Sequence, residues 1–119
     1  MSWTVVFHPA FALEYDQLTP AVQDELSAYL VYLQDAGPSL RRPHADTLKG
    51  SKHSNMKELR FSADGGVWRV AFAFDPLRRA VVLVAGDKSG VGQGRFYNQL
   101  VKTADSRFNE HLEDVEHKQ

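Results

Sequence analysis

The chain begins with a short apolar run, and apolar residues with helical spacing follow it. Residues 3–7 read WTVVF, and such a β-branched and aromatic run predicts a strand. Pro9 then opens a segment in which Phe11, Tyr15 and Leu18 are spaced for one face of a short helix. The pattern therefore predicts an N-terminal strand that leads directly into a helix.

A longer helix follows, with clear signals at both ends. Thr19 is the expected N-cap, Pro20 takes the first helical position, and Gly37 with Pro38 ends the helix. Between them runs an apolar stripe with helical spacing, formed by Val22, Leu26, Tyr29, Leu30 and Leu33. We expect the two helices to form a hairpin that covers one side of the domain and presents an acidic outer face.

Three segments with strand periodicity come next, after a connector over residues 38–55 that is expected to be irregular. Residues 56–61 and 67–74 alternate in polarity or size, and residues 80–86 are apolar on both faces, as in a central strand. Asp64-Gly65-Gly66 predicts a hairpin turn and residues 75–79 a longer loop. The segments therefore predict a three-stranded antiparallel meander.

The C-terminal part is predicted to form one helix, which follows a glycine-rich stretch over residues 86–94. Its apolar residues recur four apart: Phe96, Leu100, Ala104, Phe108 and Leu112. The order of N-terminal strand, helical hairpin, meander and C-terminal helix predicts an α+β fold. A length of 119 residues fits one domain, so residues 1–119 are expected to form a single domain.

Composition narrows the class of protein. The chain is 43% hydrophobic and 24% charged, which is typical of a globular domain and excludes wholesale disorder. Without cysteine it has no disulfide and no thiolate zinc site, and its histidines lack metal-ligand spacing, so no cofactor and no metal are expected. There is no secretory signal and no membrane-length apolar stretch, which predicts a cytoplasmic protein without a membrane partner.

The small net charge of −1 hides a strong asymmetry. Residues 1–40 hold five acids and no Lys or Arg, residues 41–107 hold thirteen Lys or Arg against six acids, and residues 108–119 hold four acids and one Lys. A basic segment on an acidic body indicates an anion-binding face, for which nucleic acid is the commonest partner. The alternative is a basic face that docks an acidic protein.

The alternation of the strands gathers part of this charge. Arg69 shares a face with the small Ala71 and Ala73, Arg60 lies on the same face one strand over, and Lys88 follows the third strand. Arginine forks and lysine point charges together bind phosphate, so we expect a shallow cationic surface that cradles phosphate. The competing reading is that Arg60 pairs with a nearby carboxylate and the lysines are merely solvated.

Other charged positions have a less certain place in the pattern. Lys57 begins the first strand of the meander with the parity of the apolar face, and His53 reads more readily as an ordinary exposed loop residue than as a proton carrier. Asp105 and Glu110 are expected to be surface charges of the last helix. Asp75, before Pro76, is expected to serve the turn alone.

Three runs carry a family resemblance over nearly the whole chain: KELRF (57–61), WRVAFAFDPLRRAVVLVAGDKSG (68–90) and FYNQLVKTADSRFNEHL (96–112). They resemble RelE/HigB-type toxins, in the HigB-like, phage-derived branch of the RelE/ParE superfamily. The resemblance implies a small RelE-like, microbial-RNase-like domain that is the toxin of a type II toxin–antitoxin system. It further implies cleavage of mRNA on the ribosome, and a cognate antitoxin, typically a helix-turn-helix protein, that keeps the toxin inactive.

Site residues follow from the resemblance and from the residue types. The expected catalytic positions are Arg60, Arg69, Lys88, Lys52 and His53. The expected RNA-binding positions lie in the connector, at the start of the meander or near the start of the last helix, and they are Arg41, Arg42, Lys49, Lys57 and Tyr97. The arginines would hold the phosphate and stabilise developing charge, while Lys52, Lys88 or His53 would move protons without a metal.

Two other functions stay open at this point. A ParE-like toxin would share the fold, lack nuclease activity and act on DNA gyrase. A non-toxic module would bind only RNA or its antitoxin.

Overall fold

A five-stranded sheet forms the centre of the molecule. In the computed structural model, which describes residues 2–118, the strand order is β1–β5–β4–β3–β2. The strands are β1 (Thr4–Phe7), β2 (Ala45–Thr47), β3 (Met56–Ala63), β4 (Gly66–Phe74) and β5 (Arg79–Asp87). β1 pairs with β5 in parallel, and the other neighbours pair antiparallel, so the predicted meander is β3–β4–β5. The α+β prediction is confirmed.

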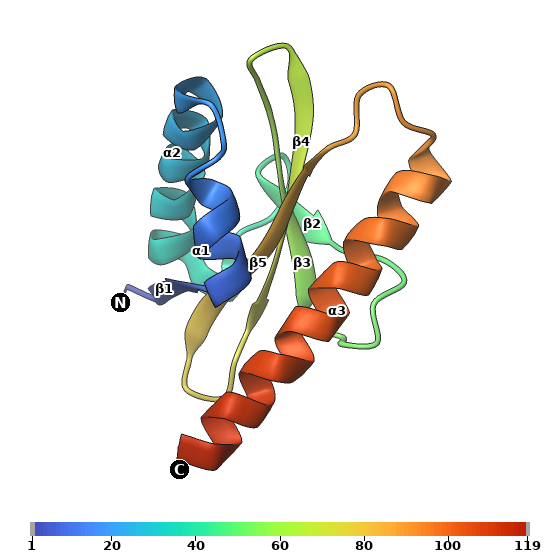
Figure 1. The fold of residues 1–119 in the computed structure, drawn as a ribbon. Helices are drawn as coiled ribbons and strands as arrows, with labels where there is room; N and C mark the ends of the chain where they lie inside the picture. Colours follow the sequence, from blue (N-terminus) through green and yellow to red (C-terminus); the bar gives the residue numbers. More distant parts are fainter. Residues whose placement is uncertain (1, 119) are drawn as a thin grey trace.

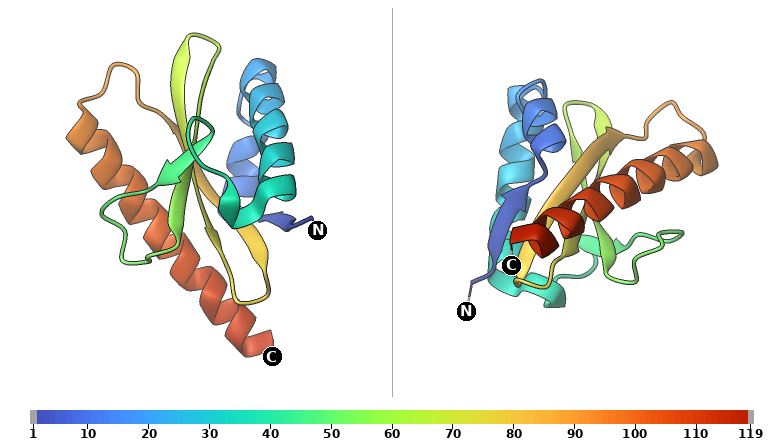
Figure 2. Two further views of the ribbon diagram at one scale, coloured as in Figure 1. Left: turned by 180° about the vertical axis from the view of Figure 1, so that it is seen from behind. Right: turned by 60° about the horizontal axis from the view of Figure 1, so that its bottom comes forward.

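Helices cover both faces of this sheet. α1 (Pro9–Tyr15) and α2 (Pro20–Ala36) lie on one face, a short 3₁₀ turn, η1 (Gly37–Ser39), follows α2, and α3 (Gln93–Lys118) crosses the other face (Figures 1 and 2). Thr19 caps α2 as predicted, since its hydroxyl accepts a hydrogen bond from the Val22 N–H at 3.4 Å. Within residues 2–118, no helix combines the length and apolar character needed to cross a membrane.

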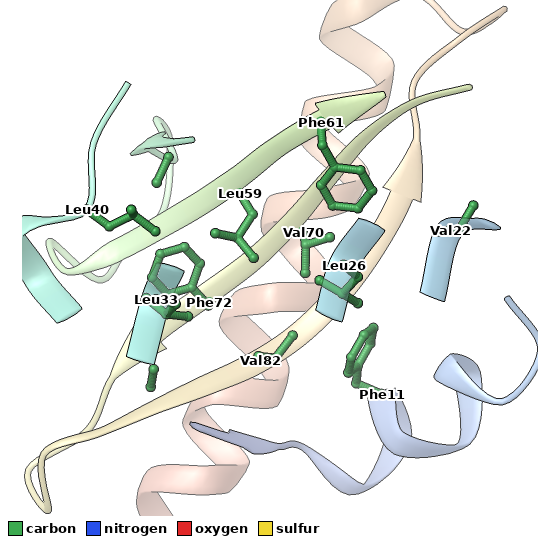
Figure 3. Packing of buried hydrophobic residues seen from close by; sticks show 12 residues of the cluster. Phe11, Val22, Leu26, Leu33, Leu40, Leu59, Phe61, Val70, Phe72 and Val82 are labelled. Carbon is green, nitrogen blue, oxygen red and sulfur yellow. The ribbon is translucent and has the colours of Figure 1, made fainter. Parts of the chain in front are cut away.

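The apolar side chains predicted along α2 pack into one of two hydrophobic cores, on the α2 face of the sheet. Leu26 and Leu33 are fully buried, and they pack with Leu59 of β3, Phe72 of β4 and Val82 of β5 (Figure 3). Every second residue of β3 and β4 faces this core, as the alternation predicts. The helical hairpin therefore buries the large side chains of the meander and leaves the other face for α3.

The second face is not the open shallow surface that the sequence analysis expects. Ala71 and Ala73 are fully buried beneath α3, against Phe96 and Leu100. Small residues let a helix approach the strands closely, and a Cβ added at Gly86 would lie only 2.9 Å from the Phe96 ring. The end of this face near Arg60 and Tyr97 stays hollowed.

The connector is also more ordered than expected. Ala45, opposite Leu59 in the register, is fully buried, and β2 adds an edge strand beside β3. Three residues are too few to show a period of two in the sequence, so only pairing with β3 reveals this strand. β2 places Asp46 and Thr47 next to the hollowed end of the sheet.

Candidate active site

A polar hollow of about 490 Å³ lies beside β3, between the β2 segment and the first turns of α3. Ionisable or hydrogen-bonding side chains line it: Arg42, Asp46, Lys49, Glu58, Arg60, Lys88, Tyr97 and Asn98. Four cations and two carboxylates thus meet in one place. Of the residues predicted for the site, Arg60, Lys88, Lys49, Arg42 and Tyr97 are brought together here.

Arg60 and Glu58 project from β3 on the same face and form an ion pair. Arg60 NH1 donates to Glu58 Oε2 at 2.7 Å, with the two side chains 20% and 5% exposed. The other oxygen, Glu58 Oε1, is buried and has no hydrogen-bond partner among the described residues. A buried acceptor without a partner costs free energy, so this oxygen is available to accept a further hydrogen bond or a proton.

Glu58 is the site residue that sequence reasoning missed. The alternation that puts Arg60 on the α3 face of β3 also puts Glu58 there, two residues earlier. The sequence therefore contains a signal for Glu58, because it is a carboxylate on the same face of the strand as the predicted cation Arg60. The competing reading of Arg60, an ion pair with a nearby carboxylate, holds in this structure.

Arg69 is buried beneath the hollow instead of lining it. It is 6% exposed and lies opposite Arg60 in the β3–β4 register. Arg69 Nε donates to the Tyr97 hydroxyl at 3.1 Å, and NH1 donates to the Trp68 C=O at 2.9 Å. Tyr97 lines the hollow, so the hydrogen bond from Arg69 positions Tyr97 there.

The two lysines of the hollow are its free cations. Arg42 pairs with Asp46 at 2.9 Å and Arg60 with Glu58, whereas Lys49 and Lys88 form no ion pair with any residue of 2–118. The Thr47 N–H and the Arg42 guanidinium hold the pKa of Asp46 below its usual value, so this carboxylate stays charged. An anion entering the hollow therefore meets Lys49 and Lys88 unpaired.

A second hollow of about 590 Å³ adjoins the first and shares Lys49, Tyr97 and Asn98 with it. The exposed Lys52 lines this second hollow, at the point where its loop meets α3. Asp105 fixes the loop, because its carboxylate accepts from the Ser51 hydroxyl at 2.5 Å and from the Lys52 N–H at 3.0 Å.

Asp105 is therefore not the surface charge that the sequence analysis expects, since it is only 9% exposed. The carboxylate of Asp75, expected to serve the turn alone, is also a buried contact: it accepts from His111 Nε2 at 2.8 Å. Both carboxylates are needed to satisfy donors on a distant element, which local sequence spacing does not show. Glu110 is 65% exposed and contacts His8 at 3.1 Å.

Three predicted site residues line neither hollow. His53 turns toward α3, where Nε2 contacts Asn109 Oδ1 at 2.9 Å and the ring lies edge-on to Phe108. Lys57 has the parity of Leu59 and lies on the α2 face of β3, and Arg41 is exposed and lines neither hollow. Within residues 2–118, no three His, Asp or Glu side chains gather as a metal-binding group.

Comparisons with known proteins identify the family to which the chain belongs. Residues 14–109 match the family described as Phage derived protein Gp49-like (DUF891). Over 97 residues the chain is 38% identical to Putative toxin HigB3 of Mycobacterium tuberculosis, covering 82% of this chain and 78% of that protein. It is 44% identical over 90 residues to Putative toxin HigB2 of the same organism, covering 75% of this chain. The chain spans only 44% of the length of HigB2.

A solved structure shares the fold. It is that of a double arginine mutant of the Escherichia coli toxin RelE in the free state, with a TM-score of 0.61. The match covers 85% of this chain and 95% of the other, at 14% sequence identity. At that identity the likeness concerns the arrangement of sheet and helices, and the chemistry of the hollow must be argued from its own residues.

Proposed function

Because the chain belongs to the Gp49-like family, among the RelE/HigB-type toxins, we propose that it is an endoribonuclease that cleaves mRNA on the ribosome. The observation that carries the proposal is the pairing of two features in one hollow. Lys49 and Lys88 are free to bind phosphate, and Glu58 offers a buried carboxylate oxygen without a partner. Cations for the phosphate and a base for the ribose are the groups that RNA cleavage requires.

Each group takes one step in the proposed reaction. Glu58 accepts the proton of the 2′-hydroxyl, whose oxygen attacks the adjacent phosphorus as the bond from phosphorus to the 5′ oxygen breaks. Arg60 exchanges its contact with Glu58 for the phosphate oxygens and stabilises the added charge, and Lys88 donates a proton to the leaving 5′ oxygen. The products are a 2′,3′-cyclic phosphate and a 5′-hydroxyl, and no metal takes part.

Substitutions at these positions test the proposal. Primer extension on mRNA from cells that express the protein should show new 5′ ends. Glu58→Gln should reduce them at least about a hundredfold, the usual contribution of a general base. Arg60→Ala and Lys88→Ala should also reduce cleavage.

A matched control is Arg78→Ala, an exposed cation on the β4–β5 loop at the far end of the sheet. It should cleave like the wild type. If the wild type produced no new 5′ ends, or if Glu58→Gln cleaved as well as the wild type, the proposed chemistry would be wrong. Inhibition of purified gyrase by the wild type would instead favour the ParE-like alternative.

The setting of the reaction is part of the same proposal. We propose a cytoplasmic toxin of residues 1–119 acting as one domain, whose substrate is held in place by the ribosome and whose inhibitor is an antitoxin of the helix-turn-helix type. The family supports an antitoxin partner. The reading frame beside that of the toxin identifies the candidate antitoxin, and co-expression should restore growth.

A further inference from the structure

The loop between β2 and β3 carries two of the lysines that line the second hollow. Residues 48–55 form this loop, which lies against the middle of α3 (Figures 1 and 2). Main-chain hydrogen bonds among Leu48, His53 and Met56 close its two ends. Within residues 2–118, no hydrogen bond joins the main chain of residues 49–52 to another main-chain group. Side-chain contacts must therefore hold the part of the loop that bears Lys49 and Lys52.

Asp105 of α3 supplies these contacts. Its Oδ1 accepts from the Ser51 hydroxyl at 2.5 Å, and its Oδ2 accepts from the Lys52 N–H at 3.0 Å. The Ser51 hydroxyl oxygen in turn accepts from the His53 N–H at 3.0 Å. Each oxygen of the carboxylate thus has a partner in the loop, and one side chain fixes the main chain on both sides of Ser51.

A second contact between the loop and α3 lies beyond the lysines. Asn109 follows Asp105 by four residues, so it lies on the same face of α3. His53 Nε2 contacts Asn109 Oδ1 at 2.9 Å, and the His53 ring lies edge-on to Phe108. These contacts fix the side of the loop that leads into β3. Residues 49–52 therefore depend on Asp105.

The place of Asp105 is unfavourable for an anion-binding surface. It is 9% exposed, it lines the second hollow together with Lys49 and Lys52, and it forms no ion pair with any residue of 2–118. A carboxylate in this place loses hydration and repels a phosphate. A role in holding the two lysines toward the hollows offsets both costs.

We propose that Asp105 is a positioning residue for RNA. It holds residues 49–52 so that Lys49 contacts the phosphate in the first hollow and Lys52 contacts the next phosphate of the strand in the second hollow. The inference rests on the proposed function in taking RNA as the ligand. Asp105 contacts the loop and no reacting group, so it acts on the binding of RNA and not on the breaking of the bond.

Hydrogen exchange on the full-length toxin without RNA tests the hold on the loop. Asp105→Ala removes both acceptors, so it should speed exchange of the Lys52 amide at least about tenfold. Asp114→Ala makes the same change at an exposed position of α3 and should leave this amide as it is in the wild type. Unchanged exchange in Asp105→Ala would overturn the proposal, whether or not the toxin cleaves RNA.

Binding to ribosomes that carry an mRNA tests the action on RNA. The toxin carries Glu58→Gln in this measurement, so the RNA stays intact. Adding Asp105→Ala should weaken binding at least about tenfold, whereas adding Asp114→Ala should not. When Lys49 and Lys52 are both alanine, Asp105→Ala should weaken binding less than about twofold further, because it acts through these lysines. An undiminished loss in that background would overturn the proposal, since Asp105 would then act on the fold or on RNA directly.

Asp105→Asn separates the hydrogen bonds from the charge. The amide oxygen can accept from the Lys52 N–H while the amide nitrogen donates to the Ser51 hydroxyl oxygen, so binding should stay within about threefold of that with Asp105. Equal losses in the Asn and Ala variants would overturn the proposal, because the charge would then matter and not the hold on the loop.

The kinetics of mRNA cleavage complete the test. In the otherwise wild-type toxin, Asp105→Ala should raise KM for the ribosome–mRNA complex and change kcat less than about twofold. A loss confined to kcat would overturn the proposal and leave the proposed nuclease standing. If the wild type did not cleave, the proposed nuclease would be wrong, and the exchange and binding measurements would still decide the role of Asp105.

Discussion

At the scale of single residues, Glu58 and Arg60 are coupled through their ion pair. Their ion pair, at 2.7 Å, compensates two charges that are largely out of water. A phosphate that binds Arg60 takes over the arginine's part of that pair and leaves Glu58 with both oxygens as acceptors. Under the proposed function, substrate binding itself prepares the base, because the same event that anchors the phosphate frees the carboxylate.

Lys49 and Lys57 provide a matched test of where RNA binds. The sequence predicts that both bind RNA, but Lys49 lines both hollows and Lys57 lies on the opposite face of β3. Lys49→Ala should lower the rate of mRNA cleavage on the ribosome about tenfold, equivalent to about 1.4 kcal/mol for one lost phosphate contact. Lys57→Ala should change the rate of mRNA cleavage less than about twofold, because Lys57 does not line the hollows. Equal losses would mean that RNA crosses the other face of the sheet.

At the scale of elements, the end of α2 is fixed by the N-terminal segment. Gly37, the C-cap of α2, has φ +54°, and a Cβ added to it would lie 2.2 Å from Trp3 Nε1. The Trp3 ring also lies edge-on to Phe74, with centroids 5.1 Å apart. The absence of a side chain at Gly37 thus allows one contact to join α2, the N-terminal segment and β4.

Gly37→Ala should therefore lower the free energy of unfolding by about 2–4 kcal/mol, because φ +54° with ψ −133° is a conformation that side chains other than glycine rarely adopt and because the new Cβ clashes with Trp3. The measurement is urea denaturation. Gly65→Ala is the control, since Gly65 also has a positive φ of 75° but open space around it. It should cost only the strain, about 1–2 kcal/mol. Equal losses in the two variants would show that the contact with Trp3 contributes nothing.

Helices and strands with a clear hydrophobic periodicity could be predicted from the sequence. A strand that is recognisable only by its pairing with another strand could not. The stripe from Val22 to Leu33 and the alternation from Val67 to Phe74 each mark a buried face, and both predictions are confirmed. The sequence does not predict β2, because this three-residue strand is recognisable only by its pairing with β3. The same reason applies to the site, where Glu58 stands out once Lys49 and Lys88 are seen around it in space.

At the scale of the whole molecule, α3 is tied to distant segments by charged contacts along its C-terminal half. Arg107 forms a two-point ion pair with Glu14 of α1, with NH2 to Oε2 at 2.6 Å. The hydrogen bond from Arg107 is the main cause that holds the pKa of Glu14 below its usual value. His111 binds Asp75 at the β4–β5 turn. These contacts fix α3 across the sheet, and with it the position of Tyr97 over the hollow.

The Asp75 contact gives the stability of this arrangement a defined dependence on pH. Burial alone would raise the pKa of Asp75, but hydrogen bonds from His111 and Arg79 outweigh it and hold the pKa below its usual value. Because the folded pKa is the lower one, the stabilisation is fully present above the unfolded value of about 3.9 and is lost as the pH falls through the folded pKa. Acid should therefore loosen the join between α3 and the β4–β5 turn.

Asp75→Asn tests this dependence, since it keeps the shape of a side chain that is fully buried and removes its charge. The variant should lose about 2–3 kcal/mol of unfolding free energy near neutral pH, because one acceptor oxygen becomes an NH2 group that faces the same donors and the charge opposite Arg79 is lost. Urea denaturation from about pH 7 down to about pH 3 should show the difference from wild type shrinking below the unfolded value of about 3.9. A difference that stayed constant over this range would assign the loss to packing instead of charge, and the tie between α3 and the turn would then have no electrostatic component.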